Sequence, residues 1–145
     1  MKISEKGIEF IIKEEGEVLT AYICPAGVWT IGVGHTGKDV KKGMKITKEQ
    51  SRELLKKDIA WAESVVNKII KIPLEQYQFD ALVSFVLNTG PNALPTSTLA
   101  KKINLNFSIE EIEKEWKKWK YGGGKILDVL ISRRKREVKL YKGEL

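Results

Sequence analysis

The sequence has few residues that could form disulfides or bind metal ions, the two kinds of cross-link that stabilise many small proteins. It contains one cysteine and one histidine among 145 residues. A single cysteine cannot form an internal disulfide framework, and a single histidine excludes a metal site with several histidine ligands. We therefore expect no disulfide, no metal and no other cofactor.

Long hydrophobic runs are also missing. The N-terminal segment holds only the short run Ile8 to Ile12, and Glu9 interrupts it. This run is too short for the apolar part of a secretory signal, and no stretch predicts a membrane helix. We expect a protein that stays in the cytoplasm of the producing cell until another component releases it.

The composition is that of a globular protein with a basic C-terminal third. Hydrophobic residues make up 42% and aromatic residues 8%, which argues against a disordered chain. The net charge is +7, and residues 101–145 have 13 basic and 7 acidic groups, so most of the excess lies there. The length predicts one domain. The basic third predicts attraction to a polyanion and leaves nucleic acid, membrane and cell wall open.

Two stretches lack charge entirely. Val18–Gly37 and Ala81–Ala100 contain no Lys, Arg, Asp or Glu. Their glycines and prolines exclude a membrane helix. They are either core with turns or two walls of a cleft for an uncharged, hydroxyl-rich ligand.

Periodicity and turn residues predict one hairpin and several helices. The hairpin is expected over residues 20–33, around the turn Pro25-Ala26-Gly27. The expected helices cover residues 4–15, 47–71 with a break, 74–87, a short segment after Pro95, 108–119 and 127–141. Gly16 is expected to end the first helix, Thr47 with Gln50 to begin the second with a capping box, and the run Gly122-Gly123-Gly124 to break the helical pattern after residues 108–119. The single domain 1–145 then has a hairpin lobe at about 14–58, a connecting helix at about 59–71 and a helical lobe at about 72–145.

Four residues suggest catalysis. Glu15 ends the first expected helix, where the partial negative charge of the helix terminus favours the protonated carboxyl that a general acid needs. By position alone, a frayed surface glutamate explains it as well. Cys24 is either a small packed residue or a nucleophile that would pair with His35. Thr30 alternates onto one face of the returning strand, where its hydroxyl would hold a water.

These residues form one string, Glu15-Gly16-x-x-x-x-Ala21-Tyr22-x-Cys24-x-x-Gly27-x-x-Thr30-Ile31-Gly32-x-Gly34-His35. The string resembles the catalytic segment of the phage-type lysozymes, glycoside hydrolase family 24. The resemblance spans Gly7 to Tyr141. Later segments that match the family are Gln78–Phe85, Asn88–Gly90, Ser97–Leu99, Gly123–Lys125 and Ser132–Glu137.

The resemblance implies a lysozyme-like α+β fold, with a cleft between the lobes and the helix 4–15 near it. It implies an endolysin that hydrolyses the β-1,4 bond between N-acetylmuramic acid and N-acetylglucosamine in peptidoglycan. Glu15 takes the general-acid position, and Cys24 and Thr30 assist water or the oxocarbenium ion. Cys24 departs from the family's commoner aspartate. The candidate substrate contacts are Gly34, Thr36, Leu87, Asn88 and Thr98.

The resemblance also implies supporting residues. Arg133 aligns with an arginine that pairs with the catalytic glutamate in this family, and the following Arg134, Lys135 and Arg136 are interpreted as a solvated basic face. His35 aligns with a structural histidine, and Asp58 falls where its carboxylate partner would be. Both lie in the expected hairpin lobe.

The expected partners follow from this function. They are peptidoglycan as substrate and a holin-type protein for release, with no physical complex between enzyme and holin. We expect a monomer in the host bacterial cytoplasm before release, acting on the wall and not on nucleic acid. Three alternatives stay open: a nucleic-acid binder using the basic residues 130–142, a cysteine-dependent peptidoglycan peptidase or amidase, and a non-catalytic wall-binding protein.

Overall fold

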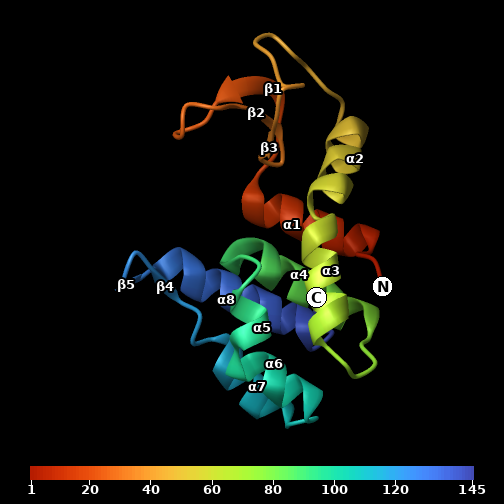
Figure 1. Cartoon of the computed structure of the whole chain (residues 1–145), viewed down its shortest axis with the longest axis vertical. Coiled ribbons are helices and arrows are strands. Elements are labelled where there is room, and N and C mark those ends of the chain that lie inside the picture. Colours follow the sequence, from red (N-terminus) through yellow and green to blue (C-terminus); the bar gives the residue numbers. More distant parts are fainter. The chain divides into compact units, whose positions relative to one another are not determined.

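A computed structural model describes all residues, 1–145, and the chain forms two compact units (Figure 1). One unit is Ile8–Ala60. The other combines Met1–Gly7 with Trp61–Leu145. The structure has no helix with the length and apolar character needed to cross a membrane.

The Ile8–Ala60 unit carries a small antiparallel sheet. Its strands are β1 (Val18–Ile23), β2 (Trp29–Gly32) and β3 (His35–Thr36), in the order β1-β2-β3. Helix α1 (Glu5–Glu15) precedes the sheet and helix α2 (Lys48–Asp58) follows it. The hairpin expected from the sequence is confirmed, whereas β3 is too short for a periodicity signal and was not predicted.

The turn between β1 and β2 begins at Cys24. The N–H of Gly27 donates to the Cys24 carbonyl at 2.8 Å, and the N–H of Cys24 donates to the Val28 carbonyl at 3.0 Å. Gly27 has φ +79°, a conformation that glycine adopts without a side-chain penalty. This turn sets the register Tyr22↔Thr30, so Cys24 and Thr30 lie at the same end of the hairpin.

The expected helix over 47–71 is two helices. Helix α2 begins with the predicted capping box, in which Gln50 N–H donates to Thr47 Oγ1 at 3.1 Å and Thr47 N–H donates to Gln50 Oε1 at 2.9 Å. The break falls at Ile59, which caps α2, and α3 (Ala60–Ile69) follows.

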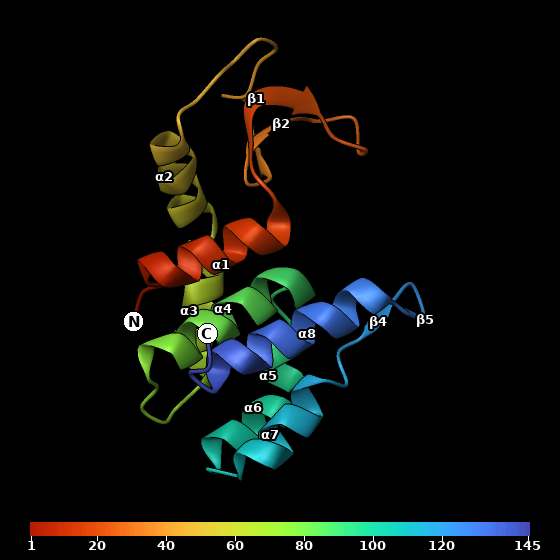
Figure 2. The same cartoon turned by 180° about the vertical axis from the view of Figure 1, so that it is seen from behind.

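The second unit is mostly helical (Figure 2). Besides α3 it contains α4 (Gln76–Thr89), α5 (Ala93–Thr96), α6 (Thr98–Asn104), α7 (Ile109–Trp116), the hairpin β4 (Tyr121–Gly122) and β5 (Lys125–Ile126), and α8 (Asp128–Tyr141). Helices α4 and α8 pack along each other in both views. Their buried faces meet a cluster of aromatic rings.

Two expectations for this unit were wrong in detail. The helix expected to reach Trp119 ends at Trp116, and the glycines after it form a hairpin rather than a simple break. Gly123 and Gly124, both with positive φ, make the turn that pairs Gly122 with Lys125. A glycine run in sequence marks a helix end, but the two residues on each side are too few to predict strands.

The core of the second unit forms around Phe85. Its ring lies 5.6 Å from Trp116 and 5.6 Å from Trp119, in edge-to-face geometry with both. Trp116 also lies 5.1 Å from Tyr141. Burial of these rings joins α4, α7 and α8, and such pairs add about 0.5–1.5 kcal/mol each beyond area burial. The whole structure is a helix-rich α+β fold, as expected.

Candidate active site

Glu15 is the last residue of α1. The helix ends there because Gly16 takes φ +83°, while its N–H still donates to the Ile12 carbonyl at 2.8 Å. The Glu15 side chain is exposed. A terminal carboxyl that reaches solvent is accessible to an incoming substrate, as a general acid must be.

Cys24 and Thr30 face each other at the end of the β1–β2 hairpin. Cys24 is half-buried, and Thr30 is 3% exposed. A hydrogen bond from the Thr30 hydroxyl lowers the pKa of the Cys24 thiol, and backbone N–H groups of Val28 and Ala26 lower it further. The turn therefore surrounds the sulfur with donors, which increases the thiolate fraction relative to an ordinary thiol.

The Thr30 hydroxyl has two acceptors for its one hydrogen. Thr30 Oγ1 lies 3.0 Å from the Val28 carbonyl oxygen and also bonds the Cys24 sulfur. A thiolate attracts a donor more strongly than a neutral carbonyl does, because charge-assisted hydrogen bonds are stronger. Ionisation of Cys24 is thus coupled to the direction in which Thr30 donates.

His35 has carboxylates on both ring nitrogens. Nδ1 lies 2.7 Å from Asp58 Oδ2, and Nε2 lies 3.0 Å from Asp39 Oδ2. Burial lowers the pKa of His35, but the hydrogen bonds and charges of Asp58 and Asp39 outweigh it and leave the pKa raised. The expected His35–Asp58 hydrogen bond is present, and Asp39 is an additional partner that the sequence did not indicate.

Gly34 and Thr36 lie on the rim of the same sheet. Thr36 is the register partner of Thr30, and its side chain is exposed. Gly34 has φ +70° in the β2–β3 turn, with open space where a side chain would stand. Within the Ile8–Ala60 unit, Cys24, Thr30 and Thr36 thus belong to one small sheet and the turn that joins its first two strands.

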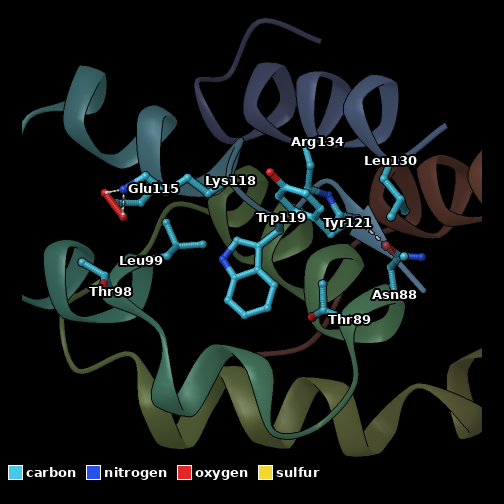
Figure 3. A pocket seen from close by; sticks show the side chains of 11 residues that line it. Asn88, Thr89, Thr98, Leu99, Glu115, Lys118, Trp119, Tyr121, Leu130 and Arg134 are labelled. Carbon is cyan, nitrogen blue, oxygen red and sulfur yellow. Dashed lines mark hydrogen bonds and ion pairs between the residues drawn. The ribbon is translucent and has the colours of Figure 1, made fainter. Parts of the chain in front are cut away.

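The second unit holds the remaining candidates. Leu87 and Asn88 lie in the last turn of α4, and Thr98 is the first residue of α6. Asn88 and Thr98 line a pocket of about 730 Å³ (Figure 3), whereas Leu87 does not. The other lining residues are Thr89, Leu99, Glu115, Lys118, Trp119, Tyr121, Gly122, Leu130 and Arg134.

The aromatic wall of this pocket was not predicted from the sequence. Trp119 and Tyr121 follow α7, and Tyr121 is 59% exposed. A tyrosine directly before a glycine run was a usable signal, because such turns lie at the surface and large exposed aromatics often mark binding surfaces. The pocket combines these rings with hydroxyl and amide groups, which suits a saccharide.

Arg133 and Arg134 share a buried carboxylate. Glu137 is 0% exposed, and burial raises its pKa against the lowering effect of both arginines. Arg133 Nε donates to Glu137 Oε2 at 3.3 Å, and Arg134 NH2 donates to the same oxygen at 3.2 Å. Ser84 and Trp116 donate to Glu137 at 2.6 and 3.1 Å. The carboxylate is therefore fully surrounded by donors.

The interpretation of Arg134 as part of a solvated face was wrong. Its side chain is 1% exposed, whereas Lys135 and Arg136 are exposed as expected. The reason is helical spacing: residues 133, 134 and 137 fall on the side of α8 that packs on α4. The expected pairing of Arg133 with Glu15 stays a prediction.

No three His, Cys, Asp or Glu side chains lie together in a way that would ligate a metal ion. The candidate catalytic and substrate-binding side chains described above carry a carboxyl, hydroxyls, a thiol and an amide. Such a set can carry out proton transfer, stabilisation of a cationic transition state and saccharide binding.

Comparison with known proteins agrees with this chemistry. A family model described as phage lysozyme matches residues 12–137. The endolysin of Salmonella phage P22 is 43% identical, covering 97% of this chain and 98% of its own length. The endolysin of Acyrthosiphon pisum secondary endosymbiont phage 1 is 44% identical, with the same coverage of both chains.

Solved structures show the same fold. The crystal structure of a P22 lysozyme mutant has TM-score 0.90 and 42% identity, covering 98% of this chain and 99% of that one. The muramidase domain of SpmX from Asticaccaulis excentricus has TM-score 0.82 and 35% identity, covering 97% of each chain. The chain belongs to the phage lysozyme family, glycoside hydrolase family 24, and is a glycoside hydrolase of the lysozyme (muramidase) type.

Proposed function

We propose that the enzyme is an endolysin that cleaves bacterial peptidoglycan at the β-1,4 bond between N-acetylmuramic acid and N-acetylglucosamine. Glu15 is the general acid that protonates the leaving oxygen. Cys24 and Thr30 act on the water or on the developing oxocarbenium ion. The observation that carries this proposal is the Cys24–Thr30 pair, a thiol whose pKa is lowered by a buried hydroxyl one strand away.

The pair supplies what the second catalytic position needs. In most two-carboxylate glycosidases this position holds an ionised group that polarises water or stabilises positive charge. An ordinary thiol has a pKa of about 8.5 and is mostly neutral at pH 7. The donors around Cys24 increase its thiolate fraction, so the sulfur takes over part of a carboxylate's task.

The remaining candidate residues have supporting parts in this proposal. Gly34 and Thr36 are proposed saccharide contacts of the Ile8–Ala60 unit, and Leu87, Asn88 and Thr98 are proposed saccharide contacts of the helical unit. Asp58 holds His35, which keeps β3 in place. The enzyme acts as a monomer and depends on a separate holin-type component to reach the wall.

A cysteine peptidase or amidase is the main alternative, and the geometry opposes it. A catalytic histidine must leave one ring nitrogen for the nucleophile. In His35 both nitrogens are taken by Asp58 and Asp39. Thr30, which cannot act as a general base of that kind, is the polar side chain that bonds Cys24.

Product analysis on purified walls tests the proposed reaction. Wild-type enzyme should release new reducing sugar ends and no new amino groups. Glu15→Gln should reduce that release by about 10²–10⁴-fold, because it removes the proton donor, with little change in melting temperature. Glu14→Gln, one residue earlier on α1, is the matched control and should retain activity. New amino groups, or near-normal turnover by Glu15→Gln, would contradict the assignment.

A further inference from the structure

The side chain of Asn88 is an exposed amide held by a buried arginine. Asn88 is exposed near the end of α4, whereas Arg134 on α8 is 1% exposed. Arg134 NH2 donates to Asn88 Oδ1 at 2.7 Å, and Figure 3 shows this bond at one wall of the pocket. Surface amides usually rotate freely, so an anchor of this kind needs an explanation.

Arg134 is itself held in one place. Its Nε lies 2.8 Å from Glu137 Oε1, and its guanidinium carbon lies 5.2 Å from the centre of the Phe85 ring. Glu137 is in turn fixed by the donors Ser84 and Trp116. The guanidinium is planar and sits between a carboxylate and an aromatic face, so it cannot turn to follow Asn88.

This anchor determines which end of the Asn88 amide faces the pocket. Arginine has donors and no acceptor, so the atom that faces it must be the amide oxygen. A rotated amide would place two sets of N–H groups against each other. The Nδ2 group therefore points away from Arg134, as Figure 3 shows, and it makes no hydrogen bond within the protein.

A fixed outward donor selects an acceptor on the ligand. Nearby, the Thr89 hydroxyl donates to the Phe85 carbonyl at 2.8 Å, which uses its only hydrogen. The aromatic side chains of Trp119 and Tyr121 line the same pocket and offer apolar surface to a sugar ring. Asn88 Nδ2 is then the directed donor of this wall.

We propose that Arg134 is a positioning residue that fixes Asn88 as a hydrogen-bond donor, so that the pocket selects sugars carrying an N-acetyl carbonyl over sugars carrying a free amine. This rests on the proposed function, in which Asn88 contacts the saccharide. A protonated amine brings only donors, and it meets the Asn88 N–H groups with the Arg134 charge behind them. The acetamido carbonyl accepts from Nδ2 instead.

Binding of two soluble probes tests the selectivity. The probes are a hexamer of N-acetylglucosamine and the fully deacetylated hexamer, measured by calorimetry in a Glu15→Gln background that prevents turnover. Asn88→Asp keeps an oxygen for Arg134 but has no N–H. It should lower the preference for the acetylated hexamer about tenfold, the loss of one well-placed hydrogen bond. Asn92→Asp, which makes the same charge change outside the pocket, should keep the preference. An unchanged preference in Asn88→Asp would overturn the proposal.

A double-mutant cycle tests whether Arg134 acts through Asn88. Arg134→Lys keeps the charge near Glu137, but a single ammonium does not reproduce the planar fork. When Asn88 is unchanged, Arg134→Lys should weaken binding of the acetylated hexamer about fivefold. When it is combined with Asn88→Ala, Arg134→Lys should cause no further loss of binding. Equal losses in both backgrounds would mean a general structural effect and would overturn the positioning role. If a melting curve shows that Arg134→Lys does not fold, Arg134→Gln takes its place in the same cycle, with the same expected and contradicting results.

The two proposals can fail separately. If Asn88→Ala binds both hexamers like the parent, the pocket does not select through Asn88 and the present inference is wrong. Release of reducing ends from walls by the wild-type enzyme would still support the proposed reaction. The converse result is that the wild-type enzyme releases no reducing ends from walls while the Glu15→Gln background still prefers the acetylated hexamer. That result would contradict the proposed reaction and leave the inference about binding preference standing.

Discussion

At the scale of single residues, Cys24, the proposed second catalytic residue, is the point of greatest interest. The hairpin places the Thr30 hydroxyl and turn N–H groups around the Cys24 sulfur, and these donors lower the pKa of the thiol. The structure thus supports a thiolate without supplying a histidine base. Two sets of variants test this interpretation.

Replacement of Cys24 separates a catalytic role from a packing role. If the sulfur assists water or the developing cation, Cys24→Asp should stay active and Cys24→Ala should lose most of the rate. Because an aspartate is ionised at neutral pH, the pH optimum of the Cys24→Asp variant should lie lower than that of the wild-type enzyme. Lysis rates and melting temperatures of both variants check this. A fully active Cys24→Ala with a normal melting temperature would remove Cys24 from the mechanism and leave Glu15 untouched.

Thr30 tests the cause of the lowered pKa of Cys24. Thr30→Val has similar shape but no hydroxyl, so the pKa of the thiol should rise toward its usual value. Because activity would need the thiolate, the acidic limb of the pH–rate profile should shift to higher pH. The loss of rate should therefore be larger at pH 6.5 than at pH 8.5. Thr30→Ser, which keeps the hydroxyl, is the control and should leave the profile in place.

At the scale of elements, the His35 carboxylate pairs fix the short strand β3. Asp58 is the last residue of α2, so the 2.7 Å contact joins β3 to the C-terminal end of that helix. A positive charge at a helix C-terminus is favourable, which adds to the effect of the two aspartates. This arrangement makes the stability of the hairpin dependent on pH.

The sign of that dependence follows from the raised pKa of His35. A group whose pKa is higher in the folded state binds its proton more tightly there, so its contribution is fully present below about pH 6.5, the value for the unfolded chain. The contribution is lost as pH rises through the folded-state pKa. His35→Gln should therefore reduce the free energy of unfolding more at pH 5.5 than at pH 8.5. Chemical denaturation at both pH values measures it, and an equal loss at both would show that protonation has no part.

At the scale of the whole molecule, the basic excess is less exposed than the sequence suggests. Lys102, Lys118 and Lys142 pair with glutamates on α7, and Arg133 and Arg134 are buried around Glu137. These pairs reduce the charge available to a nucleic acid. The exposed basic residues of α8 are Lys135, Arg136 and Lys139.

Those three residues should attract the enzyme to the anionic wall. Reversal of all three to glutamate lowers the net charge from +7 to +1 and should weaken wall binding at low salt. Cleavage of soluble fragments should persist. Reversal of Lys41, Lys42 and Lys45 changes the net charge equally at another exposed site and is the control. Co-sedimentation with walls at low and high salt checks the result, and equal behaviour of the two variants would show that only net charge matters.

The sequence by itself determined most of the local structure. Thr47 and Gln50 predicted the start of α2, and Gly16 predicted the end of α1, because capping depends on residues a few positions apart. The spacing and residue types from Glu15 to His35 carried the resemblance to the family and with it the candidate catalytic residues, and this segment is also local in the sequence. A hairpin places residues of fixed spacing together, so Cys24 and Thr30 meet through local turn geometry.

Only the tertiary structure decided that Arg134 is buried and which residues line the pocket. Arg134 lies in a basic run that looks solvated, and its burial depends on Glu137 and on the packing of α8 against α4. The pocket joins Asn88, Thr98 and Trp119, which are distant in the chain and belong to different elements. Their meeting depends on how helices pack, and helix packing is set by the shapes of whole buried faces rather than by any local pattern.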